Sequence, residues 1–233
     1  MNVVRNGVFR GTRLFQKTGS IGGGKGVFVH RGGSKDDLVT FPIGGRIMNG
    51  FKGDAKMFAG DLCEYRTDAN GVNPKIYLLK TYLVESVSGT TLNIVRDGFK
   101  HIPFVGDKLG VAPKKIGGEM TSATIVAVSK GKVGSQDVWV CTTSDALTAK
   151  KGDVLVDADA DGTMAVKAIN GVVDCDIEMF GVSATEEVDF DAVHNLYTPM
   201  RRGEMYISKM SPIPACVLEE NTSKVNGWFR VDY

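Results

Sequence analysis

Short apolar runs separated by turn-forming residues dominate the chain after residue 57. The runs are rich in Val, Ile, Tyr and Thr, which favour β-strands when Gly, Asn, Asp or Pro separates them. Strands are predicted at 76–79, 82–87, 92–95, 123–128, 138–142, 154–156 and 205–210. Between them, Gly89-Thr90 and Asp161-Gly162 predict tight turns. The pattern predicts a mostly β protein with a β-barrel or sandwich-like body.

One segment carries helix signals. Ser183 and Glu186 fit a capping box, and acidic residues crowd the turn that would follow it. The apolar residues from 188 to 192 alternate as they would in a strand, so both interpretations stay open. The sequence therefore predicts at most one short helix, at 183–196.

A Gly-Asp pair recurs at regular intervals in the β region. Gly60-Asp61, Gly106-Asp107 and Gly152-Asp153 are each followed by a β-forming run, and the intervals between them are 46 residues. Glycine tolerates a positive φ and aspartate bonds nearby backbone N–H groups, so the pair suits a chain reversal that starts a strand. The equal intervals indicate either β-units of similar size, produced by duplication, or a chance match.

The first 50 residues differ from the rest of the chain. They hold 12 of the 29 glycines, eight Lys or Arg and two acids, whereas the other 183 residues hold 20 Lys or Arg and 25 acids. The net charge of +1 therefore divides into +6 and −5. We predict a glycine-rich basic arm at 1–50 and a β domain at 51–233, with a boundary near 117–121 if that domain has two parts. A first sheet joined by ordinary glycine turns is the alternative for 1–50.

Composition excludes several classes of protein. With 42% hydrophobic and 24% charged residues the chain can bury a core, and no apolar run is long enough for a membrane helix. No signal peptide is recognisable at the start. The four cysteines show no C-x-x-C spacing, which disfavours structural zinc. We expect buried free thiols and synthesis in a reducing cytoplasm.

Two motifs suggest ligands. Residues 19–25 satisfy G-x-x-x-x-G-K, but Gly26 replaces the Ser or Thr that a phosphate loop needs. Asp157, Asp159 and Asp161, followed by Gly162, match the start of a calcium loop, whereas Ala168 stands where the bidentate acid should be. Calcium is the one cofactor that the sequence suggests. A β domain that binds calcium or carbohydrate is therefore an alternative function. An acidic hairpin tip is the simpler interpretation.

No residue pattern predicts an enzyme. The histidines lie in no metal-binding spacing and no G-x-S-x-G elbow occurs. Acidic and apolar residues alternate from Val173 to Met179, which puts the acids on one face of a strand. That face suits docking of a neighbouring copy's basic arm better than acid–base catalysis.

The basic residues of the arm are the candidate interface. They are interleaved with Phe9, Phe15 and Phe28, an arrangement that also occurs in proteins that bind single-stranded nucleic acid. A nucleic-acid-binding module is therefore an alternative, although a nucleic acid is not the partner we expect. The candidate interface residues are Arg5, Arg10, Arg13, Lys17, Lys25 and Arg31.

Two stretches resemble a known class of protein. Residues 150–156 (KKGDVLV) and 202–207 (RGEMYI) are similar to segments of tailed-bacteriophage capsid accessory proteins, meaning the auxiliary, decoration or head-fibre proteins, particularly of crAss-like phages. The resemblance implies a non-enzymatic virion protein, made in the host cytoplasm and located on the capsid surface. Its partners would be the major capsid protein and neighbouring copies of itself, without a small-molecule substrate or a membrane. A head-fibre or tail component is the alternative within this class.

Overall fold

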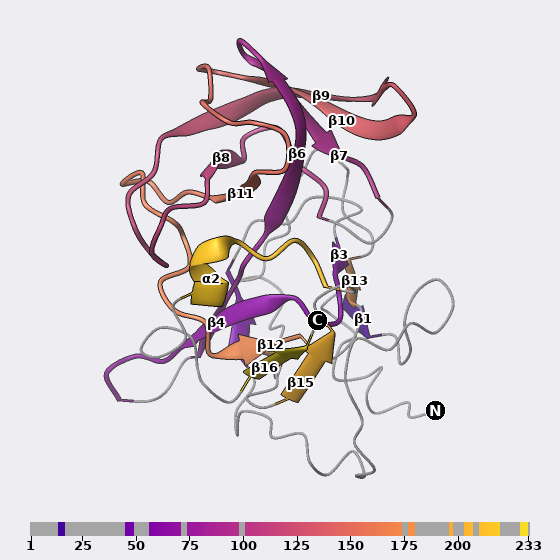
Figure 1. The fold of residues 1–233 in the computed structure, drawn as a ribbon. Helices are drawn as coiled ribbons and strands as arrows, with labels where there is room; N and C mark the ends of the chain where they lie inside the picture. The colour runs from indigo at the N-terminus through magenta and orange to yellow at the C-terminus, as the bar shows by residue number, and fades with distance from the viewer. Residues whose placement is uncertain are drawn as a thin grey trace. The chain divides into compact units, whose positions relative to one another are not determined.

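The chain forms two compact units, each built from separate stretches of sequence. The computed structural model describes residues 14–16, 45–48, 56–70, 74–97, 101–173, 177–179, 196–197, 203–206, 210–219 and 229–232 (Figure 1). Unit 1 comprises Met1–Leu78, Asn170–Met210 and Gly227–Tyr233, and unit 2 comprises Leu79–Ile169 and Ser211–Asn226. Residues 117–121 lie inside unit 2. The described elements are almost all strands, which confirms the mostly β prediction.

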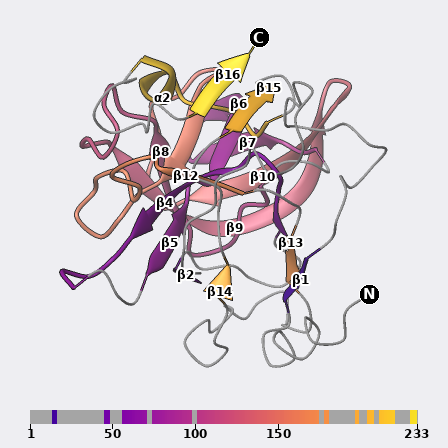
Figure 2. The ribbon, with the colours of Figure 1, turned by 90° about the horizontal axis from the view of Figure 1, so that it is seen from below.

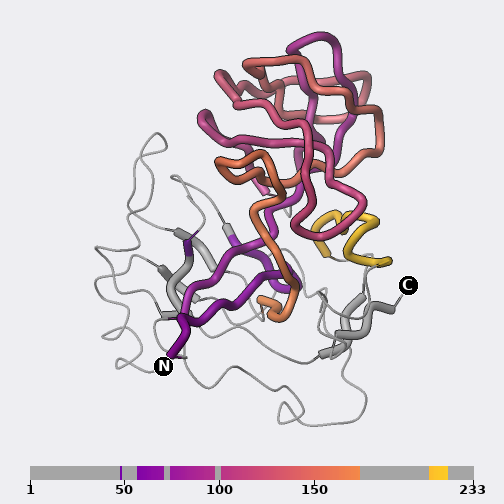
Figure 3. Tube along the Cα trace, turned by 90° about the vertical axis from the view of Figure 1, so that its left-hand side faces the viewer, coloured from indigo at the N-terminus to yellow at the C-terminus, as the bar shows by residue number. Residues whose placement is uncertain are grey.

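Unit 2 contains a closed six-stranded barrel. Going around it, the strand order is β10-β7-β6-β11-β8-β9, and every neighbouring pair is antiparallel. Because β11 lies beside β8, the strands β8 to β11 form a Greek key. Figure 3 shows the path of the backbone through the barrel as a tube. The strands are β6 (Thr81–Ser88), β7 (Thr91–Val95), β8 (Lys108–Val111), β9 (Ser122–Val133), β10 (Gln136–Thr143) and β11 (Val154–Asp157).

Apolar side chains fill the barrel. Alternate residues of its strands point inward, as period-two patterning requires. The buried cluster consists of Tyr82, Val84, Leu92, Ile94, Leu109, Ala123, Ile125, Cys141, Leu147 and Leu155. Each fully buried aliphatic side chain contributes about 1.5–3 kcal/mol relative to an exposed one. Five predicted strands coincide with barrel strands, and β9 continues beyond its predicted end.

The described residues of unit 1 form three smaller sheets. The five-stranded sheet has the order β12-β4-β5-β2-β14, and its strands are labelled in Figure 2. A second sheet has the order β1-β13-β3, and β15 pairs with β16 in parallel. The strands are β1 (Leu14–Gln16), β2 (Gly45–Ile47), β3 (Lys56–Met57), β4 (Leu62–Arg66), β5 (Lys75–Leu78), β12 (Gly171–Val172), β13 (Ile177–Met179), β14 (Leu196–Tyr197), β15 (Gly203–Tyr206) and β16 (Phe229–Asp232).

The described parts of the first 50 residues pair with strands from later in the chain. β1 pairs with β13, and β2 pairs with β5 and β14. Both the arm and its alternative, a first sheet joined by ordinary glycine turns, rest mostly on residues outside the described part of the chain, so both stay predictions. Of the predicted helix at 183–196, only Leu196 lies within the described residues, in β14. Within the described residues there is one helix, α2 (Ala215–Glu219), which the sequence pattern did not indicate.

All three Gly-Asp pairs adopt the same turn. Gly60, Gly106 and Gly152 have φ values of 90°, 98° and 90°. In each turn the aspartate N–H donates to the carbonyl three residues earlier, at 3.0 to 3.1 Å. The carboxylate of that aspartate accepts the N–H of the same earlier residue, at 2.7 to 2.9 Å. The repeat is therefore one of structure as well as of sequence.

Each Gly-Asp turn is also anchored to one β-branched residue of another segment. The glycine N–H donates to the carbonyl of that residue, and the aspartate carbonyl accepts its N–H, all at 2.8 to 2.9 Å. The anchoring residues are Val173, Ile125 and Val84 for the three turns in order, and all three are buried. The turns thus start β4, β8 and β11 and fix each of them against a second segment.

Replacing Gly152 with alanine isolates the backbone requirement of this turn. A Cβ at Gly152 meets no atom within 4 Å, so the effect is conformational. We expect a loss of about 1–2 kcal/mol in the free energy of unfolding, because an L-residue is strained at positive φ. Denaturant unfolding measures it, with Gly152→Asn as the control, since asparagine adopts positive φ more readily. Equal losses in the two variants would contradict this account.

Candidate functional site

The acidic segment that suggested calcium forms a turn after β11. A bridge between Ala158 and Met164 closes the turn, and Gly162 has a φ of 76°. The N–H of Asp159 donates to the carbonyl of Thr163 at 2.8 Å. The simpler interpretation of the sequence, an acidic hairpin tip, therefore describes the backbone.

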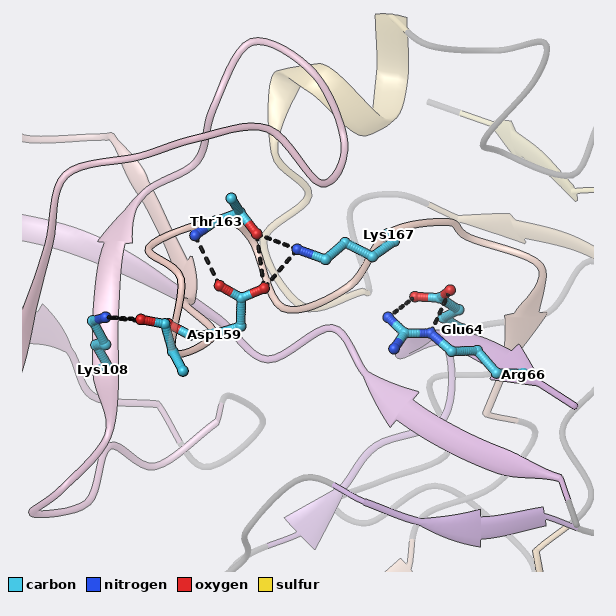
Figure 4. A network of polar contacts seen from close by, with 7 residues as sticks. Glu64, Arg66, Lys108, Asp159, Thr163 and Lys167 are labelled. Carbon is cyan, nitrogen blue, oxygen red and sulfur yellow. Dashed lines mark hydrogen bonds and ion pairs between the residues drawn. The ribbon is translucent and has the colours of Figure 1, made fainter. Parts of the chain in front are cut away.

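Lysine ammonium groups contact the oxygen atoms of this turn (Figure 4). The Nζ of Lys167 donates to Oδ2 of Asp159 at 2.7 Å and also contacts Oγ1 of Thr163. Thr163 donates to the same carboxylate through its N–H at 2.9 Å and through its hydroxyl at 2.7 Å. On the other side, Nζ of Lys108 donates to the carbonyls of Asp159 and Ala160, both at 3.2 Å.

The three predicted calcium ligands have different environments. Asp159 pairs with Lys167, whereas Asp157 pairs with Lys80, whose Nζ lies 3.0 Å from Oδ2 of Asp157. Asp161 is exposed. A calcium ion at this turn would have to displace two ammonium groups. Among the described residues, no group of three or more His, Cys, Asp or Glu side chains is placed to hold a metal ion.

Asp159 makes the turn sensitive to acid. Partial burial disfavours the carboxylate, but the hydrogen bonds from Lys167 and Thr163 outweigh that effect and lower the pKa of Asp159 below its ordinary value. A lowered pKa in the folded state contributes stability that is present above the ordinary pKa, near 4, and is lost as the pH falls below it.

We therefore expect Asp159→Asn to lower the free energy of unfolding by about 1 kcal/mol at pH 7, a figure reduced for solvent screening. The difference from the unmodified protein should shrink as the pH falls below about 4, where the unfolded chain takes up the proton first, and it should vanish only below the lowered pKa of the folded state. Urea unfolding at pH 7, 5 and 3 measures both. Asp161→Asn, an exposed carboxylate in the same turn, is the matched control. A pH-independent difference would contradict the role of the Asp159 charge.

A second ionic cluster lies within unit 2. Lys80 stands just before β6, with its side chain 6% exposed, and its Nζ lies 3.7 Å from Oδ1 of Asp107 in addition to the contact with Asp157. Oδ2 of Asp107 accepts the N–H of Phe104 at 2.9 Å and the hydroxyl of Tyr82 at 3.4 Å. One aspartate thus caps a Gly-Asp turn and holds a buried cation.

Burial changes the pKa of two groups near Lys80, Asp157 and Tyr82. It raises the pKa of Asp157, an effect that Lys80 opposes and Asp107 reinforces. Burial likewise raises the pKa of Tyr82 well above its ordinary value, with Asp107 adding to the shift. Nδ1 of His101 accepts the N–H of Thr81 at 2.9 Å. The contacts of Lys80 with Asp107 and Asp157 are therefore those of a buried ion pair within the fold.

The cysteines within the described residues behave as predicted. Cys63, Cys141 and Cys216 are buried free thiols, whereas Cys175 lies outside the described part of the chain. Burial raises the pKa of Cys141 to about 12, with a smaller contribution from Asp107. Burial raises the pKa of Cys63 as well. Reactive thiolates need the opposite shift, so these side chains act as small hydrophobes.

The predicted interface residues of the arm lie outside the described residues. These are Arg5, Arg10, Arg13, Lys17, Lys25 and Arg31. Conversely, the three lysines that complete the ionic clusters, Lys80, Lys108 and Lys167, were not predicted. The partners of Lys80 and Lys108 lie far away in sequence, so no local signal marks those pairings, whereas Asp159 lies only 8 residues before Lys167. Within the described residues, no helix has the length and apolar character needed to cross a membrane.

Comparison with known proteins gives no match: no family model, no curated protein and no solved structure corresponds to this chain.

Proposed function

We propose that the protein is a structural component of a virion, an auxiliary capsid or decoration protein of a tailed phage. In this role it binds the major capsid protein and neighbouring copies of itself on the capsid surface, without catalysis. The observation that carries the proposal is the division of charge, with +6 on residues 1–50 and −5 on the remaining 183. Opposite charges on two parts of one chain favour docking between copies or onto an acidic lattice.

The ionic clusters of unit 2 support an assembly role. Lys80 pairs with Asp107 and Asp157, and Lys167 pairs with Asp159, so two ammonium groups are paired with three carboxylates within the fold. Such pairs suit a scaffold that presents its surfaces to partners. They are poorly suited to acid–base chemistry on a substrate, which needs a group within reach of the reacting atoms.

Sheet edges offer a second means of attachment. Among the described strands, β12 and β14 form the two edges of the five-stranded sheet of unit 1. An edge strand has unpaired N–H and C=O groups and can accept an extended segment from another chain. On a capsid, weak contacts of this kind repeat at many sites, and the resulting avidity replaces individual affinity.

Neutralising arm charges tests the proposal. The variant Arg5→Gln, Arg10→Gln, Arg13→Gln changes residues ahead of β1 and leaves the described strands intact. At about 0.5 kcal/mol for each exposed pair, the loss of three charges should weaken binding to capsids of the same phage about tenfold. Co-sedimentation with purified capsids measures the affinity, and electron microscopy measures the occupancy.

The matched control removes the same charge from unit 2. Lys114, Lys115 and Lys150 are exposed, and their replacement by glutamine should leave occupancy unchanged. Undiminished occupancy in the arm variant, or the same loss in the control, would contradict the arm as the anchor. Absence of any capsid binding by the unmodified protein would overturn the proposed function itself.

A further inference from the structure

The ion pair of Lys80 lies where three strands of the barrel meet. In the ladder between β6 and β11, Thr81 is opposite Val156. Continuing this register by one residue places Lys80 opposite Asp157, the last residue of β11. Asp107 immediately precedes β8, the other neighbour of β11, and all three strands are labelled in Figure 1. The fold therefore brings one amine and two carboxylates together from three separate segments.

The amine and both carboxylates are largely removed from water. The side chain of Lys80 is 6% exposed, and those of Asp107 and Asp157 are 12% and 16% exposed. By contrast, the groups of the Lys167–Asp159 pair are closer together, at 2.7 Å, but their side chains are 39% and 28% exposed. Exclusion of water strengthens electrostatic interactions and protects reactive intermediates from hydrolysis. The Lys80 cluster is therefore the better placed of the two for a reaction between its own side chains.

The two carboxylates around Lys80 differ in how they are held. Oδ2 of Asp107 accepts the N–H of Phe104 at 2.9 Å and the hydroxyl of Tyr82 at 3.4 Å. Asp157 has its Oδ2 3.0 Å from Nζ of Lys80, but within the described residues no group donates a hydrogen bond to its buried Oδ1. A buried oxygen atom without a donor is costly, and loss of an oxygen as water removes that cost. Asp157 is therefore the carboxylate suited to react, and Asp107 the one suited to stay.

We propose that Lys80 and Asp157 join spontaneously in an isopeptide bond, with Asp107 as the catalytic residue. Nζ of Lys80 lies 3.0 Å from Oδ2 of Asp157, and the carboxyl carbon is one bond of about 1.2 Å from that oxygen. A lysine amine removed from water is a nucleophile when a neighbouring group takes its proton. Oδ1 of Asp107, 3.7 Å from the same Nζ, is that group.

The reaction is a condensation without oxidation or reduction. Nζ of Lys80 attacks the carboxyl carbon of Asp157, an N–C bond forms and one C–O bond breaks. Of the three protons of the ammonium group, two leave with the carboxylate oxygen as water and one stays on the amide nitrogen. Asp107 accepts protons from Nζ and passes them to the departing oxygen, so it ends unchanged. The buried site thereby loses one positive charge, one negative charge and one oxygen atom.

The isopeptide bond ties β6 to β11 covalently. Holding the reacting groups together in the folded barrel replaces the high concentration that such a condensation needs in solution. A cross-link also restricts the unfolded chain, so it stabilises the fold beyond the effect of the ion pair. Chains with the Lys80 ion pair are the state before the reaction, and stability comparisons of Lys80 variants apply to them. The inference goes beyond the proposed capsid role and does not rest on it.

Intact mass spectrometry of the full chain, in denaturing solvent, tests the inference. We expect a mass lower than that of the sequence by one water, about 18 Da. After digestion with trypsin, which cleaves after Lys and Arg, residues 76–96 should remain joined to residues 152–167 in one branched peptide, because acylated Lys80 is no longer cleaved. Tandem mass spectrometry should locate the junction at Lys80 and Asp157. A chain with the full sequence mass would overturn the inference.

Two aspartate variants test the role of Asp107. Asp107→Asn keeps an oxygen acceptor for the turn but removes the carboxylate that takes the proton, so it should yield at least tenfold less branched peptide. Asp153→Asn, the matched control, changes the same position of another Gly-Asp turn in unit 2 and should react as fully as the chain without substitutions. Circular dichroism checks that both variants fold. Equal cross-linking in the two variants would overturn catalysis by Asp107.

A competing reaction has the same change in mass. An aspartate followed by glycine, as in Asp161-Gly162, also loses water when its carboxyl closes onto the next backbone nitrogen as a succinimide. That product leaves Lys80 open to trypsin, so a loss of water without the branched peptide would overturn the inference. Lys80→Arg keeps a cation but lacks the amine, and it should retain the full mass of its sequence. An equal loss of water in Lys80→Arg would assign the loss to another site.

Discussion

Replacing Lys80 with methionine is expected to lower the free energy of unfolding by about 3–5 kcal/mol at pH 7, because it leaves two buried carboxylates without their cation. Nζ of Lys80 lies 3.0 Å from Asp157 and 3.7 Å from Asp107, and these carboxylate side chains are 16% and 12% exposed. Methionine keeps the length of the side chain, so the loss reports on charge and not on a cavity. Guanidinium unfolding gives the value.

A lower pH should reduce the stability that Lys80→Met loses. Burial and Asp107 already raise the pKa of Asp157, although Lys80 opposes the shift. Without Lys80 that pKa should rise further. Where a carboxyl group has a raised pKa in the folded state, the protein gains stability as the pH falls from that folded pKa toward the unfolded value near 4. The difference from the unmodified protein should therefore shrink between pH 7 and pH 4.

A second substitution controls for the charge argument. Lys80→Met combined with Asp157→Asn replaces one uncompensated carboxylate with a neutral amide of the same shape, and we expect it to recover part of the lost stability. The prediction fails if Lys80→Met costs less than about 1 kcal/mol, or if its deficit is the same at pH 4 as at pH 7.

Local features of both units could be predicted from the sequence. The strands formed by residues such as Tyr82 and Ile94 have a period-two pattern that depends only on neighbours in the chain. The three Gly-Asp turns were likewise predictable, since a positive φ at glycine and a cap from the following aspartate are both local. That all three turns share one hydrogen-bonding scheme is consistent with their common sequence.

The contacts that make up the sites could not be predicted. Lys80 meets Asp157 because β6 and β11 are neighbours in the closed barrel, and strand order depends on pairing between distant segments. For the same reason, nothing in the local sequence places Asp107 beside Lys80. The aspartates at 157 and 159 show the consequence. Their spacing suggested a cation site, but the fold supplies lysines as their partners.

The division of the chain also depends on long-range pairing. Unit 1 contains the described strands of the first 78 residues together with strands from the last third of the chain. Residues 45–47 of the predicted arm pair with β5 and with β14. A composition boundary at residue 50 marks a change in charge and glycine content, and it does not coincide with the edge of a folded unit. The arm experiment is accordingly restricted to Arg5, Arg10 and Arg13.

Adding a methyl group at Gly110 is expected to be the other strongly destabilising change, at about 3 kcal/mol. Gly110 lies in β8 and is paired on both sides, with Ser122 of β9 and with Val156 of β11. A Cβ at this position would stand 2.4 Å from the backbone carbonyl oxygen of Thr121, so one of two paired strands must move. Overpacking in a well-packed region typically costs 1–3 kcal/mol, and here the obstacle is backbone that cannot change rotamer.

Gly89→Ala separates this clash from the general effect of losing a glycine. Gly89 has a φ of 58°, and a Cβ added to it would meet no atom within 4 Å, so its replacement should cost only the strain of about 1 kcal/mol. Denaturant midpoints of Gly110→Ala, Gly89→Ala and the unmodified protein measure both losses. Because the clash lies on the β9–β8–β11 side of the barrel, Gly110→Ala should also speed amide exchange at Ser122 and Val156 more than at Val84. Equal stabilities of the two variants would show that β8 can shift freely, and the barrel would then be less tightly closed than its hydrogen bonds imply.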